Sequence, residues 1–141
     1  MISPRTSPGR RGGPLLRRES VDQLKPAQLS RLRRAFRAVL QIRDDRGYYY
    51  HAGIHGLPLR KGLSKYFCEH HTLLFLPWHR AYLYLFECAL RDQVRDVMLP
   101  WWDWSSPFSH THGIPHAYAE ERIDGENNSL YSVRIPDAAE P

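Results

Sequence analysis

The chain has 141 residues and a net charge of +5, a length that suits one domain of ordinary size. Hydrophobic residues make up 42% and charged residues 25% of it, which excludes a chain disordered throughout. No apolar run approaches the roughly 18 residues that a membrane-spanning helix needs, so we expect no membrane partner. Residues 1–20 hold five arginines against one glutamate, whereas the rest is nearly neutral. The positive charge therefore belongs to one end and does not predict a nucleic-acid partner.

That end, residues 1–20, is rich in Pro, Gly, Ser and Arg and is predicted to be a disordered basic arm. Its two arginine pairs suggest an export signal, but only Leu15 and Leu16 offer the apolar core that such a signal needs. We therefore expect no signal peptide and a cytoplasmic location. Residues 21–141 are predicted to form the folded part of the chain.

Two segments have the apolar spacing of helices. Residues 24–42 repeat apolar side chains on one face, and Pro26 suits the first turn of a helix. Residues 77–97 form the second predicted helix, on which Cys88 falls on the polar side and is expected to be a free thiol. The core-facing stripe of this helix is predicted to contain His79, Tyr82, Leu83, Phe86 and Leu90.

The remaining segments lack a sustained period. Glycines and Pro58 interrupt residues 44–58, which predicts a loop. Turn residues recur from Ser105 to the last residue, and so long a stretch without an element is unusual inside a compact domain. The aromatic segment 98–104 is expected to pack in the core. Together these features predict a mainly α chain that is part of a larger domain.

Eight histidines are the unusual feature of so short a chain. Imidazole is the commonest protein ligand for copper, zinc and iron. His70 and His79 would lie on opposite faces of one continuous helix, so they can share a metal only if the chain bends between them. A helix start at Pro77 would leave His70 in the preceding loop, and His55 could be a third donor. The alternative for His79 is a hydrogen-bonded core residue.

We expect four of the other five histidines to be structural or solvated side chains and not metal ligands. His51 is four residues before His55, but Gly53 opposes a helical pair of ligands, so we expect His51 to support the site or the fold. Three histidines are expected to be solvated side chains in a loop: His110, His112 and His116.

Three segments together resemble the tyrosinase family of type 3 copper proteins, which includes tyrosinases, catechol oxidases and molluscan haemocyanins. They are Cys68-Glu-His70, Phe75-Leu-Pro-Trp-His79-Arg80-Ala-Tyr82-Leu83 with the later Glu87, and Leu99-Pro-Trp-Trp-Asp103-Trp104. The resemblance covers about residues 36–131. It implies a mainly α fold with long loops, equivalent to the N-terminal half of the family's four-helix bundle and hence an incomplete domain.

The resemblance also implies a set of site residues. The ligands of the family's first copper match His55, His70 and His79. In many members a cysteine two residues before the second histidine is joined to that ring by a thioether bond, which makes Cys68 the candidate here; a buried free thiol is the alternative. The positions that support the site match Trp78, Arg80, Glu87 and Asp103.

The sequence departs from the family at the second copper. Its usual signature, His-Asn-x-x-His followed by a later histidine, is absent. The resemblance therefore implies one copper ion on this chain, where a complete family member holds two. Since a type 3 site needs both ions, the chain is expected to be inactive alone and to need a second chain or a further segment as a partner.

The implied activity is that of a copper-dependent polyphenol oxidase, which oxidises monophenols or o-diphenols to o-quinones with O2. Phenolic small molecules and O2 are then the expected substrates. Two alternatives stay open: an oxygen carrier of the haemocyanin type, and a truncated or split chain that only binds copper or a partner chain.

Overall fold

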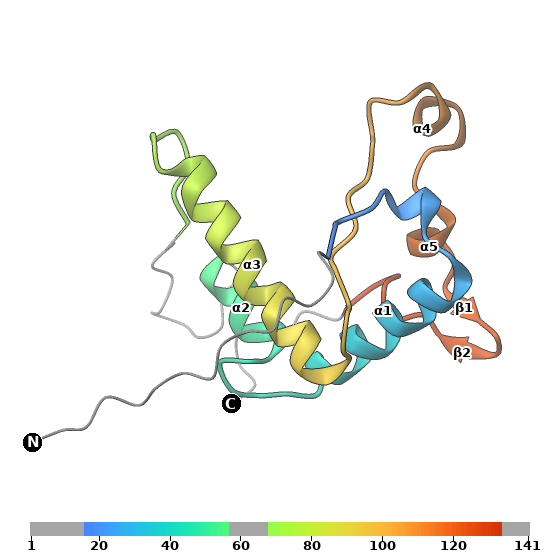
Figure 1. Ribbon diagram of the computed structural model, residues 1–141, viewed down its shortest axis with the longest axis horizontal. Helices are drawn as coiled ribbons and strands as arrows, with labels where there is room; N and C mark the ends of the chain where they lie inside the picture. Colours follow the sequence, from blue (N-terminus) through green and yellow to red (C-terminus); the bar gives the residue numbers. More distant parts are fainter. Residues whose placement is uncertain (1–15, 57–67, 134–141) are drawn as a thin grey trace, which may run out of the picture.

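The computed structural model describes residues 16–56 and 68–133. Its helices are η1 (Val21–Gln23), α1 (Pro26–Val39), α2 (Tyr48–Ile54), α3 (Phe75–Gln93), α4 (Pro107–His112) and α5 (His116–Ala119). The short strands β1 (Arg122–Ile123) and β2 (Glu126–Asn127) form an antiparallel hairpin. Figure 1 shows α1 and α2 against α3, with α4 standing apart from them. Within the described residues, no helix has both the length and the apolar character needed to cross a bilayer. The expected mainly α fold is confirmed.

The core lies between α1 and the C-terminal half of α3. The rings of Phe36 and Phe86 meet edge to face there, with centroids 5.6 Å apart. Pro26 occupies the first turn of α1, as predicted, because its missing N–H has no partner to lose at that position. The buried residues of this core are Leu32, Ala35, Val39, Phe86, Leu90 and Val97.

The N-terminal half of α3 is less covered than the sequence predicts. Leu83 was expected in the core but is 39% exposed, because α1 packs only on the later turns of the helix. The helix also begins earlier and ends earlier than predicted, at Phe75 and Gln93. It ends because Val94 is extended and Asp96 takes a positive φ of 60°.

Residues 48–54, predicted as part of a loop, form the helix α2. Gly47 precedes its first turn with an extended backbone, and Gly53 falls in its last turn, where a glycine disrupts little. Tyr48 packs on Phe86 with ring centroids 6.1 Å apart. Packing against α3 thus stabilises a helix too short to be recognised from its own period.

The described end of the predicted disordered arm is attached to the helical body. Val21 N–H donates to the Trp101 carbonyl at 2.9 Å, and Trp101 N–H donates to the Glu19 carbonyl at 3.0 Å. Arg18 forms an ion pair with Glu87. Residues 18–21 therefore contact the helical body, and the predicted arm boundary at residue 20 stays a prediction. Residues 1–15 of the predicted arm lie outside the described residues.

The aromatic segment after α3 is not in the core. Trp101, Trp102 and Trp104 are exposed, Trp104 at 70%, because the segment runs beside residues 19–21 and away from the α1–α3 core. The prediction of core packing is wrong for these side chains.

Residues beyond Ser105 contain short elements rather than only loop. Ser106 caps α4, since its hydroxyl accepts a hydrogen bond from Ser109 N–H at 3.1 Å. Asp124 and Gly125 both have positive φ, as a tight β-hairpin turn requires. The expectation that this region has no element is therefore wrong.

Candidate metal centre

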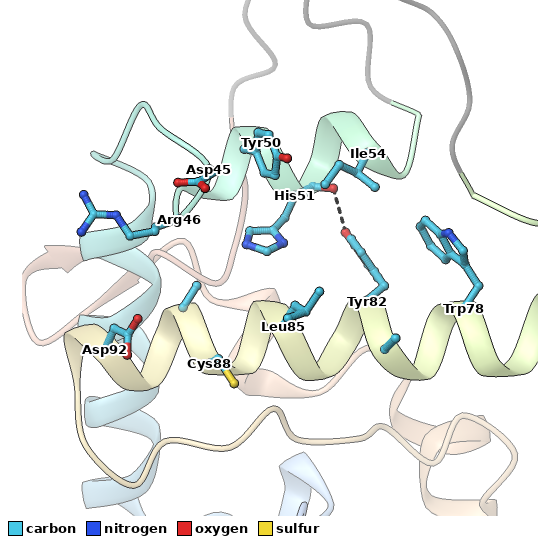
Figure 2. Close-up of a pocket in the computed structure, with 12 residues that line it drawn as sticks. Asp45, Arg46, Tyr50, His51, Ile54, Trp78, Tyr82, Leu85, Cys88 and Asp92 are labelled. Carbon is cyan, nitrogen blue, oxygen red and sulfur yellow. Dashed lines mark hydrogen bonds between the residues drawn. The ribbon is translucent and has the colours of Figure 1, made fainter. Parts of the chain in front are cut away.

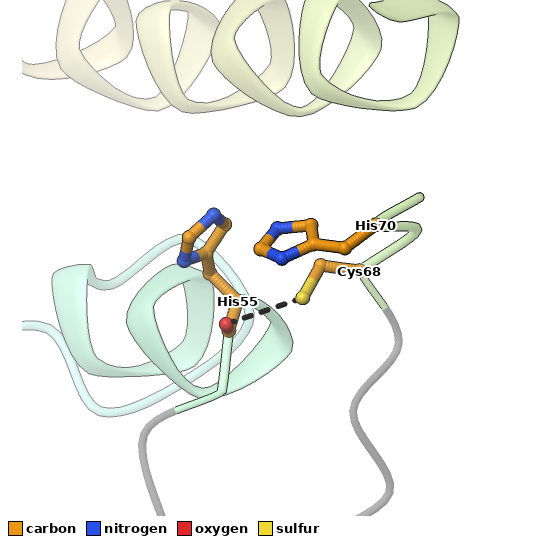
Figure 3. Close-up of side chains that lie close together, drawn as sticks. All are labelled: His55, Cys68 and His70. Carbon is orange, nitrogen blue, oxygen red and sulfur yellow. Dashed lines mark hydrogen bonds between the residues drawn. The ribbon is translucent and has the colours of Figure 1, made fainter. Parts of the chain in front are cut away.

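Three histidines that lie far apart in the sequence meet at one end of α3. His55 directly follows α2, His70 precedes α3, and His79 lies in the second turn of α3. Their ring centroids are 5.3 Å apart for His55 and His79, 5.2 Å for His70 and His79, and 5.9 Å for His55 and His70. Figure 3 shows the His55 and His70 rings next to each other, with their planes inclined at 63°. The bend expected between His70 and His79 is present.

The backbone sets which nitrogen of His79 faces the other rings. Its Nδ1 lies 2.8 Å from the carbonyl oxygen of Phe75, one turn earlier. A carbonyl oxygen only accepts, so Nδ1 carries the proton and Nε2 keeps a free lone pair. Nε2 of His79 lies 3.3 Å from Nε2 of His55. The lone pair of His79 therefore points at the meeting point of the rings.

This distance matches the donor spacing of a metal site. Two imidazole nitrogens bound at about 2.0–2.1 Å to one tetrahedral first-row ion lie about 3.3 Å apart. The stacked ring of His70 brings a third imidazole to the same place. Neutral imidazoles suit copper, zinc, iron and nickel. His55 and His79 thus have the nitrogen spacing of two ligands of one ion, and the His70 ring lies beside them, whereas the group whose donor atoms all lie within 4.8 Å of one another is His55, Cys68 and His70.

Cys68 offers a second donor set at the same point. Its Sγ and one ring nitrogen each of His55 and His70 all lie within 4.8 Å of one another. The thiol donates to the His55 carbonyl at 3.4 Å (Figure 3), and this hydrogen bond would be lost on metal binding, because a cysteine binds a metal as the thiolate. Nε2 of His79 needs no such loss of a proton, and we favour the all-histidine set. The predicted thioether bond between Cys68 and His70 stays a prediction.

The surroundings of His55 favour its neutral form. Desolvation, followed by the neighbouring His79 and His70, lowers the pKa of His55 below its ordinary value. A lowered pKa favours the neutral ring, which is the form that binds metals.

Two aromatic residues of α3 line the His55 ring. Tyr82 stacks on His55 with centroids 5.4 Å apart, and Trp78 stacks on Tyr82 at 5.3 Å. The Tyr82 hydroxyl donates to the His51 carbonyl at 3.1 Å. Burial raises the pKa of Tyr82, so the hydroxyl keeps its proton. Sequence reasoning placed Tyr82 on the His79 face of the helix but missed its contact with His55, which requires knowledge that α2 exists.

The other supporting residues inferred from the resemblance lie in different surroundings. Glu87 is buried and accepts hydrogen bonds from Arg18 and from Leu99 N–H, two helical turns beyond His79. The Asp103 carboxylate accepts a hydrogen bond from the Ser105 hydroxyl, and Arg80 is exposed. Among the supporting residues, only Trp78 packs directly on the His79 ring, at 4.8 Å.

Four of the other five histidines lie apart from this cluster, whereas the ring of His71 lies 6.4 Å from that of His70. His51 is buried with its ring 5.2 Å from that of Phe86, and burial lowers its pKa. His110 and His112 lie in α4 and His116 begins α5, rather than lying in a loop. Within the described residues, none of these three belongs to a metal-ligand group.

A cavity of about 470 Å³ opens between α2 and α3 beside the histidine cluster (Figure 2). Trp78 and Tyr82 contribute to its wall and also contact the rings of the cluster. Leu85 and Cys88 continue the lining along α3, and Asp92 lies at the far end. We call this cavity the α2–α3 groove. It lies along a different face of α3 from the one that α1 covers.

Comparisons with known proteins identify the family of the chain. Residues 45–137 match the family described as the common central domain of tyrosinase. A tyrosinase of Aspergillus oryzae is 36% identical over 124 residues, which cover 82% of this chain and 23% of that protein. Haemocyanin units G and H of Sepia officinalis are 34% identical over 97 residues, which cover 66% of this chain and 17% of that protein.

A solved structure shares the fold. The tyrosinase of Burkholderia thailandensis superposes with a TM-score of 0.76 at 28% identity, over 87% of this chain and 29% of that one. The chain belongs to the tyrosinase family of type 3 copper proteins. It spans less than a third of these relatives.

Proposed function

We propose that this chain supplies the first copper site of a tyrosinase-like polyphenol oxidase, with His55, His70 and His79 as the ligands. The observation that carries the proposal is the 3.3 Å distance between Nε2 of His55 and Nε2 of His79, together with the Nδ1 contact that leaves the His79 lone pair free. The matches to tyrosinases support copper as the metal.

In the proposed reaction, copper supplies one-electron redox chemistry toward O2, and two ions are needed to oxidise a monophenol or o-diphenol to an o-quinone. The residues of this chain hold and orient one ion. The Phe75 carbonyl oxygen accepts a hydrogen bond from His79 Nδ1–H, and the stacked aromatic rings of Trp78 and Tyr82 shield one side of His55.

The second copper site is proposed to come from a further segment or a second chain. Support comes from the α2–α3 groove and from Leu85, which lines it and is 59% exposed. Exposed apolar surface in a groove often marks an interaction site. The chain alone is proposed to be inactive.

Copper binding is the first test. The purified chain is titrated with copper and washed, and the metal is counted by elemental analysis. The proposal expects about one tightly held ion per chain, as three ligands allow. Two tightly held ions, or none, would overturn it.

Activity is the second test. The copper-loaded chain is assayed for catechol oxidation alone and after mixing with a polypeptide that carries the missing part of the domain and its own copper. The proposal expects no quinone from the chain alone and quinone formation on mixing. A silent mixture in which both copper sites are occupied would count against an oxidase.

An oxygen carrier is the second candidate, favoured by the similarity to the Sepia officinalis haemocyanin units. The two functions differ in whether a phenol reaches the metal. Reversible O2 binding by the mixture, with no oxidation of added catechol, would assign the carrier function.

A further inference from the structure

Tyr82 joins α3 to the end of α2 that carries His55. Its hydroxyl donates to the His51 carbonyl at 3.1 Å, and His55 N–H donates to the same carbonyl at 3.3 Å. The hydrogen bond from Tyr82 therefore ties α3 to His51, in the last turn of α2, and His55 directly follows that turn. Figure 2 shows this bond spanning the space between the two helices.

The Tyr82 ring also faces the imidazole itself. The two rings are stacked at 29° with centroids 5.4 Å apart, and Trp78 stacks on Tyr82 at 17°. Tyr82 is buried enough that desolvation is the main cause of its raised pKa. Trp78 also lies 6.3 Å from His55, so the three rings pack against one another, which limits the orientations that His55 samples.

His55 needs such support more than His79 does. His79 is fixed by the hydrogen bond from its Nδ1 to the Phe75 carbonyl. In the described part of the chain, His55 has no corresponding hydrogen bond at Nδ1, and its side chain is exposed. A metal-ligating histidine usually donates its second ring N–H to a carboxylate or carbonyl. For His55, stacking on the Tyr82 ring and the hydrogen bond from Tyr82 to α2 take the place of that contact.

We propose that Tyr82 is a positioning residue for the metal centre, which orients the His55 imidazole toward His79 through its ring and holds the end of α2 through its hydroxyl. This inference rests on the proposed copper site. It assigns Tyr82 no direct contact with the ion.

Two substitutions separate the contributions of Tyr82. Tyr82→Phe removes the hydroxyl and keeps the ring, whereas Tyr82→Leu removes both. Tyr84→Phe and Tyr84→Leu are matched controls, because Tyr84 lies on the same helix, is exposed and packs near Arg91 away from the histidines. Cu(II) affinity is measured on the full chain by competition with a chelator, together with the electron paramagnetic resonance spectrum and the thermal midpoint of the metal-free protein.

We expect Tyr82→Leu to raise the copper Kd about 10- to 100-fold and to change the copper spectrum, as loss of a residue supporting a ligand does. Tyr82→Phe should fall between Tyr82→Leu and wild type, and both Tyr84 variants should match wild type in affinity and spectrum. If Tyr82→Leu does not fold, Tyr82→Phe carries the test, with weaker copper binding expected at a thermal midpoint equal to that of Tyr84→Phe.

The inference is overturned if the Tyr82 variants fold and bind copper with the affinity and spectrum of wild type. It is also overturned if their loss of affinity is matched by the Tyr84 variants, since the effect would then be general destabilisation. Failure of the wild-type chain to bind copper would instead refute the proposed function on which the inference rests.

Discussion

Each imidazole of the metal centre is held by a different neighbour. His79 is fixed through the Phe75 carbonyl, His55 is stacked on Tyr82, and His70 is stacked on His79. Each ring contacts the other two, but His79 is also fixed by a hydrogen bond to the backbone, so we expect its loss to disturb the donor set most.

Replacing His79 with alanine should therefore reduce retained copper from about one ion per chain to nearly none. His112→Ala is the matched control, since His112 makes the same Nδ1 contact to a carbonyl one turn earlier, Phe108, but lies outside the cluster. Copper is counted after washing. Stoichiometric copper in His79→Ala, or equal losses in both variants, would contradict the assignment of His79.

Buried His51 gives the metal-free fold a pH dependence. Burial lowers its pKa in the folded state, against a smaller opposing effect of Asp45, so the unfolded chain takes up a proton at higher pH than the folded one. Its contribution to stability is present above the ordinary histidine pKa of about 6.5 and is lost as pH falls through the lower folded value.

The free energy of unfolding, measured with urea, should thus fall between pH 7.5 and pH 5.5, and His51→Leu should lose less over that interval than wild type. The comparison concerns the change with pH, so a constant cost of the substitution does not affect it. Equal pH dependence in the two proteins would show that His51 does not contribute.

At the scale of elements, α1 and α3 could be predicted because an apolar period runs along each of them. The convergence of His70 and His79 could also be predicted, from the need for a bend near Pro77. The helix α2 could not, because seven residues with a glycine have little helical preference of their own and form by packing on α3. The contact between Tyr82 and His55 depends on α2 and was missed for the same reason.

The exposed aromatic segment after α3 shows a second limit. Apolar composition predicted that Trp101, Trp102 and Trp104 would be buried, but composition does not say which surface covers a side chain. In the described residues the backbone of this segment pairs with residues 19–21 instead.

Glu87 links α3 to the segments around Arg18 and Leu99, so its loss should destabilise the fold. Its carboxylate is 2% exposed and accepts hydrogen bonds from Arg18 and from Leu99 N–H. In Glu87→Gln the amide leaves part of this pairing unsatisfied, which we expect to cost about 1–3 kcal/mol of unfolding free energy.

Glu126→Gln is the matched control for this substitution. Glu126 is paired with Arg37 but is exposed, and exposed pairs contribute about 0–1 kcal/mol. Urea denaturation of both variants measures the difference. A cost for Glu87→Gln no greater than that for Glu126→Gln would show that the buried carboxylate does not hold these elements together.

At the scale of the whole molecule, two faces of the helix α3 have different surroundings. One face of α3 is covered by α1, whereas the other lines the α2–α3 groove. A helix that is apolar on both sides is typical of the interior of a larger bundle. The chain also spans less than a third of its tyrosinase relatives, which agrees with a groove that receives further structure.

Leu85→Ser should therefore weaken the complex with the rest of the domain, measured as the concentration needed for half-maximal quinone formation on mixing. Ile114→Ser is the control, because Ile114 is 60% exposed, like Leu85 at 59%, but does not line the groove. Neither substitution should change the stability of the chain alone by more than about 0.5 kcal/mol. Equal effects on complex formation would contradict docking at the groove.

X-ray absorption at the copper edge of the loaded chain identifies the atoms bound to the metal, so it tests the three-histidine site most directly. We expect nitrogen neighbours at about 2.0–2.1 Å with the outer-shell signals of three imidazoles, unchanged in Cys68→Ala. A sulfur neighbour near about 2.3 Å that disappears in Cys68→Ala would show that Cys68 replaces His79 in the donor set, and would contradict the three-histidine site.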